Sequence, residues 1–352
     1  MQKILAEHFH IRVEIDEIEE LISTLDNSCL LENVHFQEAQ AEAIKAYRAA
    51  SHRKPLLAGN SYPEHPDSLR KSLDEYLQNI ASIAPVSLNG NSPDHFLHGV
   101  ISPHIDYLRG GNVYAQTWKC AQQLAQEADL AIILGTDHYG ASETPTLTRQ
   151  NYATPYGVLP TAVDIVDALA EVIGPEQAFS GELRHIGEHS VELSSVWLHH
   201  MRQGKPYEIL PILCGSFERY TFGEGIPESD TPTNHFIDTI LEMTKDKRVL
   251  VVASADLSHV GPAFDGDPLD DTGKAVVQTA DTVLLDNICQ GDAQGFFAAN
   301  KKDKDQYNVC GLVPIYMALR LLGGQTGELV SYEQCPADDV NTSIVSVCGV
   351  VF

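Results

Sequence analysis

Histidines follow three short apolar segments of this chain, each within a few residues of the segment's end. The segments are Leu97–Ser102, Leu130–Gly135 and Val249–Ser254. The side chains that follow them are His104, His138, Asp256 and His259. Imidazole and carboxylate groups bind transition metals, and two histidines with one further ligand leave coordination positions open. If the segments are parallel strands, their carboxyl ends meet at one edge of a sheet. We therefore expect these side chains to share one pocket, with Asp137 and Asp256 as possible orienting groups for the imidazoles.

Two other stretches could complete such a site. His189 opens a helix and would project from its N-terminal end, but a capping motif built on Ser190 explains the same pattern equally well. Cys310 precedes a helix that we expect to begin near Pro314. A cysteine near a helix N-terminus has a lowered pKa and can act as a thiolate ligand or nucleophile. A buried, unreactive thiol is the alternative for Cys310.

The elements that must position these residues alternate between strands and helices. Two further strand candidates are Tyr207–Leu213 and Ile344–Phe352. The predicted helices are Val113–Glu127, Ala162–Ile173, Ser190–Met201, His235–Met243, Thr272–Cys289 and Pro314–Leu322. Strands that are apolar throughout and separated by helices predict an α/β fold, with a mainly parallel central sheet and helices on both faces. Gly110-Gly111 is interpreted as a turn.

The first fifty residues have a different character. Apolar residues recur at helical spacing between Ile15 and Leu25, and a second helix is expected from Phe36 to Ala50. We interpret residues 1–52 as an N-terminal helical extension without chemistry of its own. Ser87–Asp94 is the best candidate for a linker in the first third of the chain.

Composition narrows the class of protein. The chain has 352 residues, with 23 basic against 49 acidic residues and a formal net charge of −26. This balance argues against nucleic acid and anionic membranes as partners, since both attract basic surfaces. No segment approaches the roughly 20 apolar residues of a membrane span, and the N-terminus lacks a signal peptide's apolar core. Seven scattered cysteines without a CxxC pair favour reduced thiols and a cytoplasmic location.

Six separated motifs resemble the Memo family, whose prokaryotic members are called AmmeMemoRadiSam system protein B. The resemblance covers residues 53–352 and implies the fold of the class III extradiol dioxygenases, the LigB-like enzymes. The motifs are LLAGNSYP at 56–63, ISPHIDYLRGG at 101–111, ILGTDHYG at 133–140, GEHSVELSSVWL at 187–198, SADLSHVG at 254–261 and NVCGLVPIY at 308–316.

The resemblance implies roles for particular residues. His104, His138 and Cys310 correspond to the metal ligands, Asp256 and His259 to the accompanying pair, and His189 to the histidine of the EHS motif, which we expect to bind or polarise the substrate. His259 also matches the catalytic base of the dioxygenases. Those relatives hold Fe(II) with two histidines and a carboxylate, so a cysteine in the third position departs from ring-cleaving enzymes. A second departure is Ile105-Asp106, where the family usually has Ala-Gly.

From the residues and the resemblance together, we expect a metal-binding protein. If it is an enzyme, we expect a metal-dependent, dioxygenase-like oxidoreductase. The metal would be Fe(II), with copper or zinc as alternatives. The family's name implies an AMMECR1-like protein and a radical SAM protein as partners. The alternative is a non-catalytic module that uses the dioxygenase pocket to bind a metal, a small molecule or a peptide. A third option is a zinc hydrolase, and fold alone does not decide among these functions.

Overall fold

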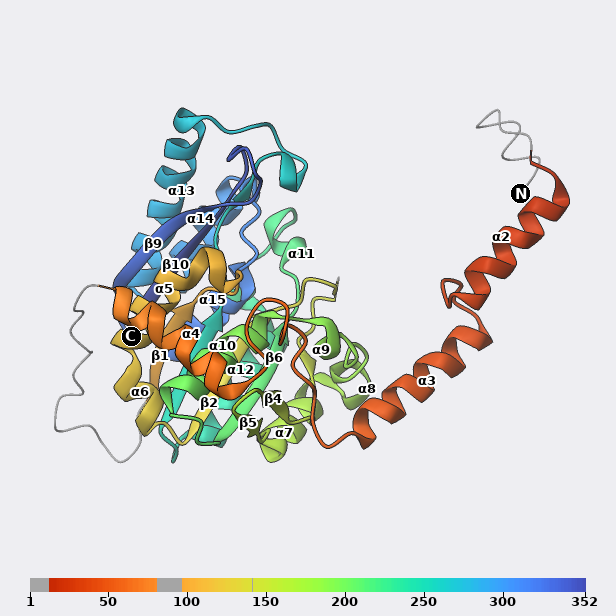
Figure 1. Ribbon diagram of the computed structural model, residues 1–352, viewed down its shortest axis with the longest axis horizontal. Helices are drawn as coiled ribbons and strands as arrows, with labels where there is room; N and C mark the ends of the chain where they lie inside the picture. The colour runs from red at the N-terminus through yellow and green to blue at the C-terminus, as the bar shows by residue number, and fades with distance from the viewer. Residues whose placement is uncertain (1–12, 81–96, 141) are drawn as a thin grey trace. The chain divides into compact units, whose positions relative to one another are not determined.

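The computed structural model describes residues 13–80, 97–140 and 142–352. The chain divides into two units, Met1–Ser51 and His52–Phe352. In the first unit, α2 (Ile15–Asn27) begins with a capping box between Glu14 and Glu17, and α3 (Val34–Ala49) follows (Figure 1). The predicted helical extension is therefore helical where it is described. Its first twelve residues and the predicted linker at 87–94 lie outside the described residues, and the division into domains at residue 52 stays a prediction.

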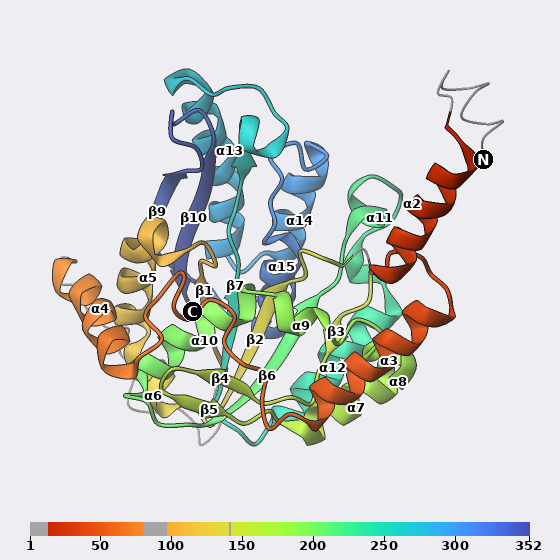
Figure 2. The ribbon, with the colours of Figure 1, turned by 45° about the vertical axis from the view of Figure 1, so that its right-hand side comes forward.

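The second unit is organised around an eight-stranded sheet in the order β3-β6-β2-β7-β1-β10-β8, with β9 paired to β10. Its four central strands are parallel (Figure 2). They are β6 (Glu208–Cys214), β2 (Leu130–Thr136), β7 (Val249–Ser254) and β1 (Leu97–Ser102). Each is almost entirely buried, which is the pattern of a strand covered on both faces. Four of the five predicted strands are therefore parallel, and the fifth, predicted at Ile344–Phe352, pairs with its neighbours antiparallel.

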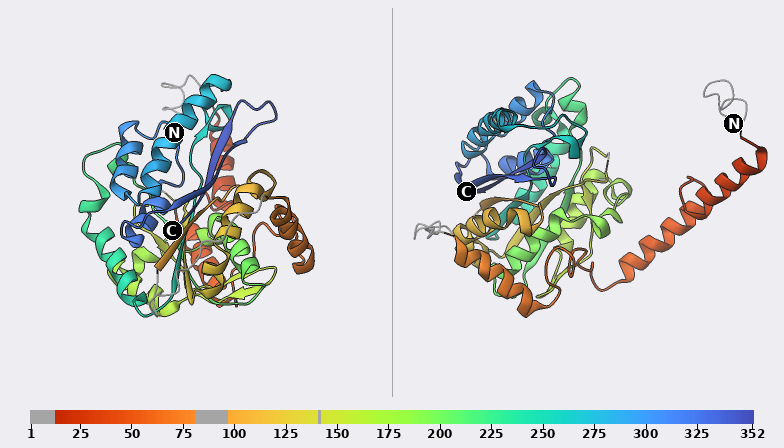
Figure 3. Two further views of the ribbon diagram at one scale, coloured as in Figure 1. Left: turned by 90° about the vertical axis from the view of Figure 1, so that its left-hand side faces the viewer. Right: turned by 45° about the horizontal axis from the view of Figure 1, so that its top comes forward.

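The strands outside this centre are antiparallel, so the sheet is mixed. The long strands β9 (Glu328–Pro336) and β10 (Ile344–Val351) pair along their whole length (Figure 3). Only residues 337–343 connect them, too few for the crossover that a parallel pair needs. The short strands β3 (Thr146–Leu147) and β8 (His259–Val260) pair with β6 and β10. A separate hairpin is formed by β4 (Tyr152–Thr154) and β5 (Gly157–Leu159).

Helices cover both faces of the sheet, as expected for this class. Alternating residues of β2 show the two faces: Ile132 and Leu134 belong to one buried cluster, Ala131 and Ile133 to the other. The first cluster includes residues of α7 (Val163–Ile173), α12 (Thr231–Thr244), α13 (Asp271–Cys289), α14 (Ala293–Lys302) and α15 (Leu312–Leu322). The second includes residues of α4 (Pro66–Asn79), α5 (Tyr107–Cys120), α6 (Gln122–Glu127) and α10 (Ser190–Met201).

The interpretation of Gly110-Gly111 as a turn is wrong, because both glycines lie inside α5. This helix begins six residues before the predicted start, since the Asp106 side chain caps it by accepting a hydrogen bond from the Arg109 backbone N–H. A Cβ at Gly111 would lie 2.3 Å from the Tyr76 ring, so glycine here lets α4 pack closely on α5. The predicted helix Val113–Glu127 is divided between α5 and α6 at Ala121.

Three short helices connect the larger elements: α8 (Pro175–Ala178), α9 (Arg184–Gly187) and α11 (Glu218–Thr221). Among the described residues, the helices are all too short or too polar to cross a bilayer.

Candidate metal centre

His104 lies on the loop that leaves β1 and is held on two sides by the end of β7. Its ring Nδ1 donates to the Ser254 carbonyl at 2.9 Å, and its backbone N–H donates to Asp256 Oδ1 at 2.8 Å. The side chain is buried. Because the proton is placed on Nδ1, the Nε2 lone pair of His104 is available to a metal ion.

His138 lies just beyond β2, beside a buried carboxylate. Both Glu188 oxygens lie 3.1 Å from His138 Nδ1, and Glu188 Oε2 also accepts the His138 backbone N–H at 3.0 Å. The hydrogen bond from the backbone N–H fixes the loop, and the contact with Nδ1 fixes the orientation of the ring. As at His104, this arrangement places the ring proton on Nδ1 and leaves Nε2 unprotonated, which makes the imidazole a better donor to a metal.

The same carboxylate positions His189 at the start of α10. Glu188 Oε1 accepts the backbone N–H groups of His189 and Ser190 at 2.8 and 2.9 Å, and it lies 3.3 Å from His189 Nδ1. A negative charge at a helix N-terminus is favourable. The capping motif predicted on Ser190 is not what forms, because the Ser190 hydroxyl donates to the Thr136 carbonyl of β2 instead. Gly135 permits this approach, since a Cβ there would meet Ser190 Oγ at 2.5 Å.

His104, His138 and His189 form a group that could hold a metal ion, with ligand atoms all within 4.8 Å of one another. The rings of His138 and His189 are stacked with centroids 4.9 Å apart, and His104 stands edge-on to both. Each Nδ1 faces a protein oxygen, so the three Nε2 atoms remain for a shared ligand. This donor set fits a transition metal.

Cys310 adjoins this group from the loop before α15. Its Sγ lies 3.2 Å from His104 Nε2 and 3.8 Å from the Asp256 carbonyl. The Cys310 carbonyl accepts a hydrogen bond from Thr136 Oγ1, which ties the loop to the end of β2. At the next residue, Gly311, a Cβ would lie 2.4 Å from the Asp256 carbonyl, so only glycine permits this approach.

The pKa of Cys310 moves in the opposite direction to the one that a helix N-terminus suggests. Burial raises it well above the ordinary value, and the nearby Asp256 carboxylate adds to the rise. Cys310 is therefore a neutral thiol until a cation displaces its proton, and metal binding through this sulfur would release that proton.

His259 and the two aspartates take distinct places around the histidines. His259 lines the same cavity and donates from Nδ1 to the Leu257 carbonyl at 3.1 Å. Burial lowers its pKa, although the Asp256 charge opposes this, so the ring is neutral near pH 7. Asp256 also accepts the Ile105 backbone N–H at 3.3 Å, which makes it an orienting group for the His104 loop. Asp137 instead pairs with Arg184 at 2.8 Å.

The histidines open onto a cavity of about 510 Å³, large enough for a small organic ligand. Its walls include apolar residues such as Leu193, Phe264 and Val345. Asp106 lies at its edge, where it pairs with Arg109 at 2.6 Å while capping α5. Asp106, which replaces the glycine usual in the family, therefore supplies a helix cap and one partner of an ion pair at the cavity.

Sequence reasoning missed the buried groups that hold the segment with Glu188 and His189 in place. The Arg53 guanidinium, 2% exposed, donates to the carbonyls of His185, Ile186 and Glu188 and pairs with the Glu192 carboxylate. Glu192 also accepts the backbone N–H groups of Leu56 and Leu57 and the Tyr62 hydroxyl. The only signal for Glu188 was its position next to His189.

The buried His185 gives the fold a pH dependence. Its Nε2 donates to the Thr146 carbonyl and its Nδ1 accepts from the Tyr152 hydroxyl, and burial lowers its pKa to about 3. Between pH 6.5 and 3 the unfolded chain binds a proton that the folded chain excludes, so stability falls as the pH is lowered. Through this residue, we expect the free energy of unfolding to fall by about 2 kcal/mol when the pH is lowered from 7 to 5.

Urea unfolding of the metal-free protein at several pH values measures this effect. His185→Gln keeps one donor and one acceptor but does not titrate, so its stability should fall less steeply with pH. Equal slopes for the two proteins would contradict the assignment.

The sequence is similar to a known protein family and to several of its members. Residues 53–351 match the model of the family described as Memo-like protein. A "MEMO1 family protein" of Aquifex aeolicus is 25% identical over 344 residues, covering 96% of this chain and 82% of the relative. One of Methanosarcina acetivorans is 26% identical over 302 residues, covering 84% and 96%. A third, of Methanopyrus kandleri, is 26% identical over 313 residues, covering 85% and 98%.

Proposed function

The chain belongs to the Memo-like protein family, and from this premise we propose that it binds a redox-active transition metal at its histidine cluster and acts in oxygen-dependent or other redox chemistry. Fe(II) is the proposed metal, with copper and zinc as alternatives. One observation carries the proposal: three imidazoles, each with Nδ1 facing a protein oxygen, bring ring nitrogens within 4.8 Å of one another. They do so at an open cavity of about 510 Å³.

We assign the ligands as His104, His138 and Cys310, with His189 directed to the substrate. The contact of 3.2 Å between Cys310 Sγ and His104 Nε2 supports this set, as does the family resemblance. A thiolate is a soft, strongly donating ligand that suits iron, copper and zinc. His189 is the competing third ligand, because its ring belongs to the three-histidine group.

A bound redox-active metal would supply electron transfer and open coordination positions for a substrate or dioxygen. The chain's own residues would do the rest. His259, neutral and with Nδ1 engaged by the Leu257 carbonyl, would accept a proton at Nε2. Asp256 would hold the His104 loop, and the apolar wall near Phe264 would receive the body of the substrate.

Metal analysis after anaerobic purification tests the ligand set. We expect His104→Ala and Cys310→Ser to lose most of the metal bound by the unaltered protein, and His189→Ala to retain it. Loss in His189→Ala with retention in Cys310→Ser would instead assign the three-histidine set. Unchanged metal content in all three variants would refute a site at this cluster.

Oxygen uptake with catechols separates an enzyme from a binding module, when the anaerobically purified protein is transferred to air-saturated buffer for the assay. Uptake that is abolished in His259→Ala, with metal retained, would support turnover through this base. Metal binding without uptake would favour the non-catalytic module. We further propose the AMMECR1-like and radical SAM proteins as partners, on the family's name alone, and a pull-down against both tests that proposal.

A further inference from the structure

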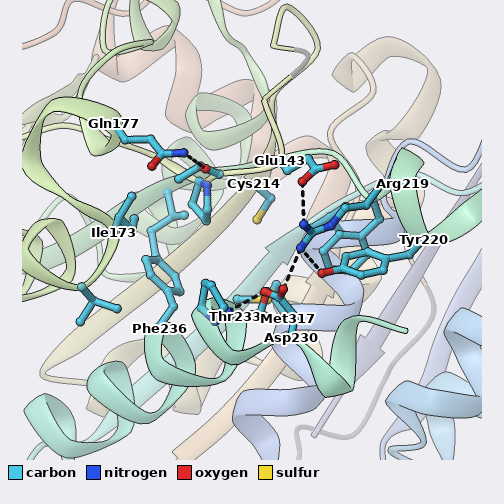
Figure 4. A pocket seen from close by; sticks show the side chains of 18 residues that line it. Glu143, Ile173, Gln177, Cys214, Arg219, Tyr220, Asp230, Thr233, Phe236 and Met317 are labelled. Atoms are coloured by element: carbon cyan, nitrogen blue, oxygen red, sulfur yellow. Dashed lines mark hydrogen bonds and ion pairs between the residues drawn. The ribbon is translucent and has the colours of Figure 1, made fainter. Parts of the chain in front are cut away.

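A second cavity, of about 310 Å³, lies among β6, α7, α12 and α15. Figure 4 shows its charged side chains, Glu143, Arg219 and Asp230, gathered on one side, with Ile173 and Phe236 on the other. We propose that this cavity binds a small arylalkyl amine, with the aromatic ring inside and the ammonium group at Glu143. The site would be additional to the metal centre, and its existence does not depend on the proposed function.

One wall of the cavity is apolar. Ile212 of β6, Phe236 of α12 and Met317 of α15 all contribute buried side chains to its wall. Cys214 adds a thiol whose pKa burial raises well above the ordinary value, so it is an uncharged wall group rather than a nucleophile. The part of a ligand that packs against this wall must therefore be apolar, because a polar group there would lose its hydrogen bonds to water.

The volume limits the size of that apolar part. A cavity of about 150 Å³ lined by apolar side chains binds benzene. The present cavity has about twice that volume, which suits one aromatic ring with a short chain. It also stands near the lower end of the range of known ligand pockets, about 300 Å³.

The mouth of the cavity determines the sign of the ligand's charge. Arg219 pairs with Glu143 at 3.0 Å and Asp230 at 2.7 Å, so two carboxylates face one guanidinium and the formal balance is −1. Asp230 is also occupied as the cap of α12, since it accepts the Thr233 backbone N–H and hydroxyl at 2.9 and 2.6 Å.

Glu143 is the carboxylate left with spare capacity. Its side chain is 44% exposed and meets Arg219 through Oε2. An ammonium group can donate to this carboxylate, whereas an acidic ligand would meet its repulsion and a guanidinium that is already paired. Charge complementarity at the mouth therefore favours an amine over a carboxylate of the same shape.

This cavity and the cavity at the histidines have different walls. Among the described residues, none lines both this cavity and the one at the histidines. The two sites can thus be tested apart, and a His138→Ala protein should bind the amine as the unaltered protein does.

Isothermal titration with four matched probes tests the proposal. We expect 2-phenylethylamine to bind about two- to fivefold more tightly than 2-phenylethanol, the range of a partly exposed ion pair. Its affinity should exceed that of 3-phenylpropionate by a larger factor than it exceeds that of 2-phenylethanol. Ethylamine, which lacks the ring, should bind at least about tenfold more weakly. Equal affinity for ethylamine and 2-phenylethylamine would overturn the proposal, because it would mean surface ion pairing alone. A preference for 3-phenylpropionate would also overturn it.

Two variants locate the binding. Glu143→Gln should remove the advantage of the amine over the alcohol, while Glu171→Gln, an exposed acid on α7 outside the lining, should preserve it. Ile173→Trp fills part of the cavity and should weaken every aromatic probe by at least about tenfold. Binding that survives Ile173→Trp, or that responds equally to both glutamate changes, would place the ligand elsewhere and refute the proposal.

Discussion

Glu188→Gln is expected to lower the affinity for the metal by about 10- to 100-fold, the range seen when a group that orients a ligand is lost. The amide would keep an acceptor for the N–H groups of His189 and Ser190. In the unaltered protein His138 Nδ1 donates to the Glu188 carboxylate, whereas in the variant the amide NH₂ group would face this nitrogen. His138 would have to move its proton to Nε2, the atom that the metal needs.

Electrostatics add to this effect. Burial by itself would raise the pKa of Glu188. The hydrogen bond and charge of His138, with the charge of His189, outweigh burial and hold the pKa of Glu188 at about 2. The reciprocal hydrogen bond raises the pKa of His138 against the effect of burial. A neutral amide removes a negative charge next to two imidazoles and so weakens their attraction for a cation.

Competition with a metal chelator measures the change in affinity. Glu182→Gln is the matched control, because Glu182 is also buried and its carboxylate accepts a hydrogen bond from the Thr148 hydroxyl. Its affinity for the metal should stay within about threefold of the unaltered protein, since no ligand loses its orienting group. Equal losses in the two variants would mean that general loosening of the fold, and not the orientation of His138, causes the effect.

Arg53→Met is expected to lower the free energy of unfolding by about 3–5 kcal/mol, as for other buried ion pairs that lose one partner. Both Arg53 and Glu192 are about 1% exposed at the side chain, so the remaining carboxylate would stay buried without its cation. Three carbonyls of residues 185–188 would also lose a donor. Since these carbonyls precede His189, we expect weaker metal binding as well.

Urea denaturation of the metal-free variants provides the measurement. Arg248→Met removes an arginine from a well-formed but exposed pair with Asp129, whose side chains are 41% and 46% exposed. That control should cost about 1 kcal/mol or less. A comparable cost at both positions would show that the Arg53 network contributes no more than a surface ion pair.

Local patterns in the sequence were sufficient for the main elements and for the strand-end histidines. The run Val249–Ser254 is apolar enough to be a buried strand, and parallel strands must end at a common edge. His104, His138 and His259 therefore lie around one cavity, as predicted. Ser190–Met201 was predicted to the residue, because Met201 is followed by polar and glycine-containing sequence.

Contacts between segments far apart in the chain decided the rest. Gly110-Gly111 is a turn by local preference but lies inside α5, where the ring of Tyr76 from α4 packs against Gly111. Burial next to Asp256 reverses the pKa shift that the helix N-terminus alone would give Cys310. Glu188 acquires its role from a partner 50 residues away, His138. The sequence by itself determined which donor groups exist and on which loops they stand. Only the tertiary structure decided which nitrogen each histidine presents, because that depends on oxygens brought near by the fold.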